Sequence, residues 1–109
     1  MTGIDGGGGD RRGRDRAALR AEAHHLSPLV HVGHGGVTEP VVRTLDDALR
    51  TRELVKVDVS RNVEDAVRDV ARTLAAATAS EVVQVIGRKV TLYRENPELE
   101  RKDGVPPWR

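Results

Sequence analysis

The 109-residue sequence contains no cysteine and no phenylalanine, and its aromatic side chains are limited to Tyr93 and Trp108. Without cysteine, the chain can form neither a disulfide framework nor a metal site built on thiolates. The shortage of aromatics also excludes an RNA-recognition surface of the RRM type, in which paired aromatic side chains stack on bases. A domain of this length must therefore build its core from valine, leucine, isoleucine and alanine.

The chain also lacks any apolar run that approaches the roughly 20 residues of a membrane-spanning helix, and it shows no signal peptide. We therefore expect a soluble, cytoplasmic protein with no membrane partner. Neither sign of charge is in clear excess, because 18 basic and 17 acidic residues give a formal net charge of +1. This balance alone gives almost no support for a nucleic-acid partner.

Basic residues are nevertheless clustered along the chain. Five arginines lie between positions 11 and 20, and the stretch 88–94 holds two arginines and a lysine without an acidic residue. Arginine suits bidentate phosphate contacts, although a GC-rich genome favours it equally. Residues 1–14 are rich in glycine and arginine and have no apolar periodicity, so we expect them to be disordered. Such a tail either adds non-specific RNA affinity or is a solvated extension.

Apolar periodicity predicts seven elements in the order α-β-α-β-α-β-β. Asn62 offers an N-cap for the third helix, with Asp65 at the position that can complete a capping box. Helices that alternate with strands, followed by a hairpin at Gly87-Arg88, predict a two-layer α/β domain with a mixed four-stranded sheet. We place this domain at residues 15–95 and a polar tail at 96–109. The predicted helices are 16–26, 39–50 and 63–77, and the predicted strands are 29–32, 54–59, 81–86 and 89–94.

A glycine-rich loop joins the first strand to the second helix. Gly33, Gly35 and Gly36 allow positive φ angles and close backbone approach, and Thr38 is a plausible N-cap for the helix that follows. Backbone N–H groups of such a loop attract phosphate, which we assign to RNA. A plain strand-to-helix connection is the alternative. No Gly-Lys-Ser/Thr follows the loop, so it is not a P-loop.

Neither metal chemistry nor catalysis is indicated. The four histidines, His24, His25, His31 and His34, match no standard ligand spacing, and no cysteine completes a site. Within the loop, His34 can stack on a base when neutral or pair with phosphate when protonated. The serines have no nucleophile-elbow context. We therefore expect a protein that is not an enzyme and needs no cofactor, metal or small-molecule substrate.

With its elements placed, the chain resembles the YhbY-like proteins, which consist of a single CRM domain (the chloroplast RNA splicing and ribosome maturation module). The resemblance covers about residues 16–95, and the matching segments occur in the order that the family shows. These segments are Leu19-Arg20 through Ala23-His24-x-Leu26-x-Pro28, Val32 to Thr38, Glu53 to Val57, Gln84 to Arg88, and Leu92 to Arg94.

The resemblance implies a domain similar to the C-terminal domain of bacterial translation initiation factor three. It also implies non-catalytic RNA binding, to ribosomal RNA in precursors of the large ribosomal subunit, as an assembly factor. The near-zero net charge leaves open an adaptor that docks on ribosomal proteins or factors. Basic residues are common in the family where Ser27, His34 and Asp58 stand, so this chain has fewer fixed positive charges.

The resemblance maps the family's RNA-contacting loop onto four residues. Five basic side chains could line one surface with that loop, and an ordinary solvated face is the alternative for each of them. Contacts of this kind with phosphates would position RNA without reading its sequence. The expected RNA-binding residues are Gly33, His34, Gly35, Gly36, Arg20, Lys56, Arg88, Lys89 and Arg94.

Overall fold

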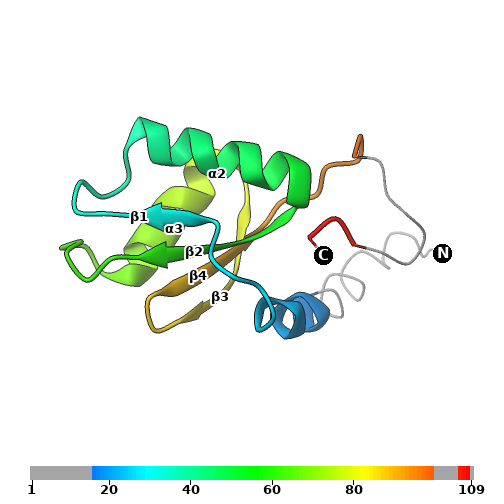
Figure 1. The fold of residues 1–109 in the computed structure, drawn as a ribbon, viewed down its shortest axis with the longest axis horizontal. Coiled ribbons are helices and arrows are strands. Elements are labelled where there is room, and N and C mark those ends of the chain that lie inside the picture. The colour runs from blue at the N-terminus through cyan, green and yellow to red at the C-terminus, as the bar shows by residue number, and fades with distance from the viewer. Residues whose placement is uncertain (1–15, 100–105, 109) are drawn as a thin grey trace.

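The computed structural model describes residues 16–99 and 106–108. Residues 16–23 form the first helix, and the order of elements is the predicted α-β-α-β-α-β-β (Figure 1). The labelled elements are β1 (Val30–Val32), α2 (Glu39–Arg52), β2 (Leu54–Val59), α3 (Val67–Thr78), β3 (Glu81–Ile86) and β4 (Lys89–Tyr93).

The four strands form one mixed sheet in the order β1-β2-β4-β3, which confirms the predicted sheet. Strand β1 is parallel to β2, whereas β4 is antiparallel to both of its neighbours. Asp58 near the end of β2 is aligned with His31 in β1 and with Lys89 at the start of β4. The segments that follow β1 and β2 and the turn that precedes β4 therefore meet at one end of the sheet.

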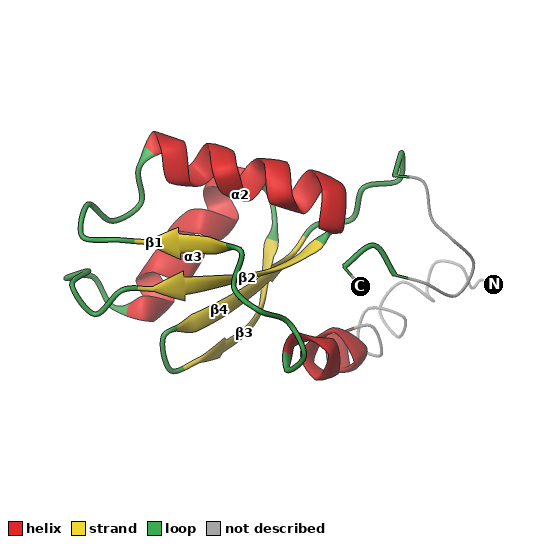
Figure 2. Cartoon of the chain, viewed as in Figure 1, coloured by secondary structure: helices red, strands yellow, loops and turns green. Residues whose placement is uncertain are grey.

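Helices α2 and α3 lie side by side over one face of the sheet (Figure 2). These two helices and the sheet form the predicted pair of layers, because alternate residues of β2, namely Val55, Val57 and Val59, face the helices. The first helix lies on the opposite face, where Leu19 packs with Leu54 and Val83 in a separate cluster. The main core includes Leu45, Leu49, Val55, Val57, Val59, Leu74, Val90 and Leu92, all fully buried.

The predicted start of the third helix was wrong. Helix α3 begins at Val67, and its N-cap residue is Ala66, which makes no side-chain capping bond. The amide of Asn62 instead donates to Oγ of Ser60 at 3.1 Å, within a loop whose Val63 is buried against the core. Burial of Val63 draws this segment into the core before the helix starts. The first helix also ends earlier than predicted, at residue 23, and the other boundaries differ by two residues or fewer.

The described part of the predicted C-terminal tail contacts the domain. The amide of Asn96 donates to Oε2 of Glu53 at 2.7 Å, and Trp108 packs against the cluster of the first helix. The predicted disorder of residues 1–14 lies outside the described residues. Within residues 16–99 and 106–108, no helix has the length and apolar character needed to cross a membrane.

Candidate nucleic-acid interface

The glycine loop forms a tight turn that leads directly into α2. The amide of Gly36 donates to the carbonyl of Gly33 at 2.8 Å, and Gly36 has a φ of 73°. Thr38 caps the helix as predicted, because its side-chain oxygen accepts a hydrogen bond from the amide of Val41 at 3.4 Å. The loop therefore places the exposed backbone of residues 33–35 beside the positive end of a helix of 14 residues.

At two positions of this loop, nothing in the described part of the chain requires a glycine. A Cβ atom added at Gly33 would meet no described atom within 4 Å, and one at Gly35 would meet only Cγ2 of Thr38 at 3.7 Å. Neither residue has a positive φ, whereas Gly36 does. Intramolecular geometry therefore explains Gly36 alone, and the bare backbone at the other two positions leaves space for the close approach of another molecule.

Two further segments lie beside the glycine loop. The amide of Ser60 donates to the carbonyl of Val32 at 2.9 Å, which holds the β2–α3 loop against the end of β1. The guanidinium of Arg88 donates to the carbonyl of Val59 at 2.8 Å and to that of Ser60 at 2.5 Å. These bonds use two of its five N–H donors, and the other three remain for a ligand. Arg88 therefore lies beside the loop.

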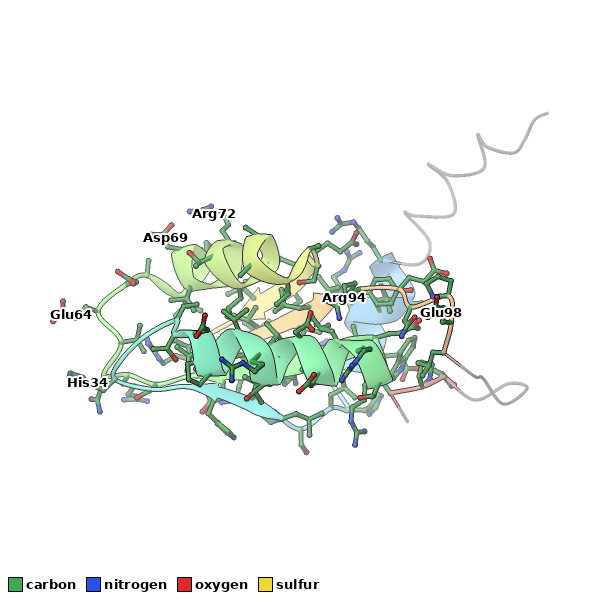
Figure 3. All side chains as sticks on the ribbon, turned by 90° about the horizontal axis from the view of Figure 1, so that it is seen from above. His34, Glu64, Asp69, Arg72, Arg94 and Glu98 are labelled. Atoms are coloured by element: carbon green, nitrogen blue, oxygen red, sulfur yellow. The ribbon has the colours of Figure 1, made fainter. Side chains whose placement is uncertain are left out.

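The exposed Arg61 completes this end of the molecule, although the sequence interpretation did not include it. It is the second residue after β2, and because β2 is parallel to β1, the segment that follows β2 lies near the segment that follows β1. Figure 3 shows His34 at the same end together with Glu64. We call Gly33 to Gly36, Arg61 and Arg88 the loop-end surface.

Lys89 also lies at this end, but its charge is matched by Asp58. Its Nζ is 2.8 Å from Oδ1 of Asp58, and Nδ1 of His31 is 3.5 Å from Oδ2 of the same carboxylate. The hydrogen bond from Lys89 holds the pKa of Asp58 below its ordinary value of 3.8, with a smaller contribution from His31. The three side chains form a partly exposed ionic cluster on the face of the sheet opposite α2 and α3. We call this the open face.

The structure does not bring the other predicted cations to the loop. Lys56 lies on the open sheet face nearer the start of β2, and Arg20 lies on the first helix, which packs at that same end. Arg94 lies at the opposite end of the molecule from His34 (Figure 3). Its guanidinium donates to Oδ1 of Asp46 at 2.6 Å and to the carbonyl of Thr78 at 2.7 Å.

These contacts give Arg94 a structural role. They join the end of β4 to both α2 and α3, and the arginine side chain is only 22% exposed. The five cations that were predicted to share one surface are therefore divided among the loop end, the open sheet face and the half-buried junction of β4 with α2 and α3. The described His, Asp and Glu side chains form no group of three suited to a metal ion.

Comparisons with known proteins identify the family of the chain. Residues 12–94 match the CRS1 / YhbY (CRM) domain. The chain is 42% identical over 86 residues to a Bacillus subtilis protein named Probable RNA-binding protein YqeI, covering 79% of this chain and 90% of that protein. It is 33% identical over 87 residues to a Haemophilus influenzae protein named RNA-binding protein, covering 80% and 88% of the two chains.

A solved structure is similar as well. The solution structure of a hypothetical protein from Staphylococcus aureus has a TM-score of 0.70 and 41% identity to this chain. The match covers 87% of this chain and 97% of the other. The similarity in sequence and in fold therefore extends over nearly the whole length of that protein.

Proposed function

Because the chain belongs to the CRS1 / YhbY (CRM) domain family, we propose that it is a non-catalytic RNA-binding protein that contacts the RNA backbone through the loop-end surface. The observation that carries the proposal is the exposed glycine turn at the start of α2. Gly33 and Gly35 have space for a Cβ atom and no positive φ, so their lack of side chains is explained by a ligand that approaches the backbone.

The mechanism is electrostatic positioning of the RNA backbone. A phosphate lies against the exposed backbone of the glycine turn and the positive end of α2, which lowers its free energy there. Arg61 and the unused donors of Arg88 neutralise neighbouring phosphates. His34, exposed in the turn, stacks on a base when neutral or pairs with phosphate when protonated. Contacts of this type fix the position of RNA and leave its sequence unread.

Binding and its salt dependence test this mechanism. Each phosphate that the protein neutralises releases counterions, so RNA affinity is expected to fall steeply between about 50 and 200 mM salt. Gly35→Asp places a carboxylate in the turn, with only Thr38 nearby, and should lower the affinity by tenfold or more. Thr73→Asp adds the same charge on the exposed side of α3 and serves as the control. Affinity that is flat with salt, or equal in the two variants, contradicts the mechanism.

We further propose that the RNA is ribosomal RNA in precursors of the large ribosomal subunit, so that the protein acts in the cytoplasm as an assembly factor. The resemblance to the YhbY-like proteins supports this assignment. In a sucrose gradient of cell lysate, the protein should sediment with precursor large-subunit particles and lose this association in the Gly35→Asp variant. Wild-type protein that remains at the top of the gradient contradicts the assignment.

A protein-interaction adaptor is the second candidate. Ile86, at the end of β3, is 53% exposed and Leu29 is 46% exposed, and such apolar side chains occur in protein interfaces. The pairing of Lys89 with Asp58 also reduces the positive charge of the open sheet face. Capture of the tagged protein from lysate with and without ribonuclease separates the two functions. Ribosomal proteins that remain bound after RNA digestion, and are lost in Ile86→Ser, support the adaptor.

A further inference from the structure

A cleft of about 210 Å³ lies on the open face of the sheet, between the segment that follows the first helix, the start of β2 and the C-terminal segment. Its apolar lining consists of Leu26, Leu29, Leu54 and Trp108. Leu54 is fully buried, whereas Leu29 is 46% exposed, which is high for a leucine. The cleft is at the end of β1 that is away from the glycine loop, so it is separate from the loop-end surface.

Two cations and a histidine border this apolar lining. Arg52 from the last turn of α2, Lys56 from β2 and His25 from the turn after the first helix all contribute to the cleft. None of the described residues that line it is a carboxylate, although acidic residues are as frequent as basic ones in the chain. The cleft is therefore complementary to an anionic group attached to an apolar one.

Trp108 lines the cleft and is held in place by two contacts. Its indole Nε1 donates to Oε1 of Glu22 at 3.2 Å. Its ring meets that of Tyr93 edge to face, with centroids 6.5 Å apart and an interplanar angle of 83°. An aromatic ring fixed in this way loses little side-chain entropy when a ligand stacks on it.

From this juxtaposition we propose that the cleft binds one nucleotide of a single-stranded RNA segment, with the base against Trp108 and a phosphate beside Arg52 and Lys56. A nucleotide combines a flat π-face with an anion, which an acidic peptide does not. A base paired within a duplex cannot enter the cleft, so the RNA must be single-stranded here.

This inference rests on the proposed function, to which it adds a second contact point. Strand β1 connects the cleft to the loop-end surface. Leu29 precedes this strand and Gly33 follows it, a separation of about 13 Å at the usual rise per strand residue. One short RNA segment that crosses His31 and Lys56 on the open face reaches both points. The loop-end surface then holds the backbone, and the cleft selects for an unpaired nucleotide.

Fluorescence of Trp108 tests the inference without any substitution, because it is the single tryptophan of the chain. The full chain is titrated with a uridine nonamer RNA, a 12-base-pair RNA duplex and a hexaglutamate peptide. We expect the nonamer to quench the tryptophan emission with saturation, and the duplex to bind at the glycine loop without quenching. Binding of labelled nonamer to variants is then measured by anisotropy.

Trp108→Leu should weaken nonamer binding about tenfold, because it removes one stacked base. Arg52→Ala should weaken it several-fold and reduce the salt slope by about 1. The control is Arg50→Ala, on the same helix, whose side chain pairs with Asp47 and does not line the cleft. It should bind RNA as the wild type does.

The outcomes that contradict this inference can be distinguished from those that contradict the proposed function. Nonamer binding with unchanged emission and unchanged affinity in both cleft variants overturns the inference while the proposed function stands. Absence of binding to both RNAs overturns the proposed function as well. Saturable quenching by hexaglutamate that the nonamer does not displace identifies the occupant as an acidic peptide, which also overturns the inference.

Discussion

The glycines of the loop differ at the level of single residues. Gly36 has a φ of 73°, whereas Gly33 lies outside the left-handed region with open space around it. Gly36→Ala should therefore lower the free energy of unfolding by about 1–2 kcal/mol, the cost of a left-handed conformation for an alanine. Gly33→Ala should leave it nearly unchanged and lower RNA affinity instead. Urea denaturation of the two variants checks this, and an equal loss of stability in both would contradict the assignment.

The ionic cluster of Asp58 predicts a pH dependence of stability. Because the pKa of Asp58 is held below its ordinary value of 3.8, chiefly by the hydrogen bond from Lys89, the ionised form is favoured in the folded state. This stabilisation is fully present above pH 3.8 and is lost as the pH falls through the lower folded value. The effect is small, since the carboxylate is 32% exposed.

Asp58→Asn tests this directly. The difference in urea midpoint between wild type and variant should decline as the pH is lowered from 5 to 2.5. A difference that does not change with pH contradicts the interpretation. The same variant frees Lys89 at the loop end of the sheet, so its RNA affinity at neutral pH should exceed that of the wild type.

Arg94 shows how a side chain that the sequence assigns to binding can instead join elements of the fold. Arg94→Ala removes hydrogen bonds to Asp46 and Thr78 and should lower the free energy of unfolding by about 2 kcal/mol. Arg72→Ala is the control, because its pair with Asp69 is exposed and should contribute less than about 0.5 kcal/mol. If chemical denaturation shows the same loss of stability in both variants, Arg94 has no structural role and is again a candidate for binding.

At the level of elements, the sequence predicted the strands and helix ends that are determined by residues close together in the chain. Alternating valines specified β2, and Thr38 specified the start of α2, because both signals act within a few residues. The start of α3 was missed because the burial of Val63 is decided by the rest of the core. Periodicity likewise gave the first helix an apolar stripe containing Leu19, without indicating which face of the sheet that stripe covers.

In the candidate site too, the sequence predicted the parts that are formed by residues close together in the chain. The glycine loop is contiguous in sequence, so its geometry could be foreseen, and Arg88 followed from the hairpin turn. The ion pairs that occupy Lys89 and Arg94 could not, since their partners lie 31 and 48 residues away. Arg61 could have been found from the rule that loops after adjacent parallel strands meet at one edge.

At the level of the whole molecule, the C-terminal segment and the first helix support each other on the open face of the sheet. Trp108 bonds to Glu22 and packs with Tyr93, and Asn96 bonds to Glu53 and Arg50. The domain therefore uses residues beyond the boundary at 95 that the sequence predicted. A chain that ends at residue 95 loses all of these contacts.

Such a truncated chain should unfold with a free energy lower by at least about 2 kcal/mol, from exposure of the apolar surface that Trp108 covers. Its melting temperature should fall by roughly 10 °C. The control is a chain without residues 1–14, whose composition predicts disorder, and which should melt as the full chain does. Thermal unfolding followed by circular dichroism compares the three chains. If removal of residues 96–109 leaves the melting temperature unchanged, the first helix is held to the sheet by Leu19 and its neighbours alone, and Trp108 is free to serve RNA without a structural role.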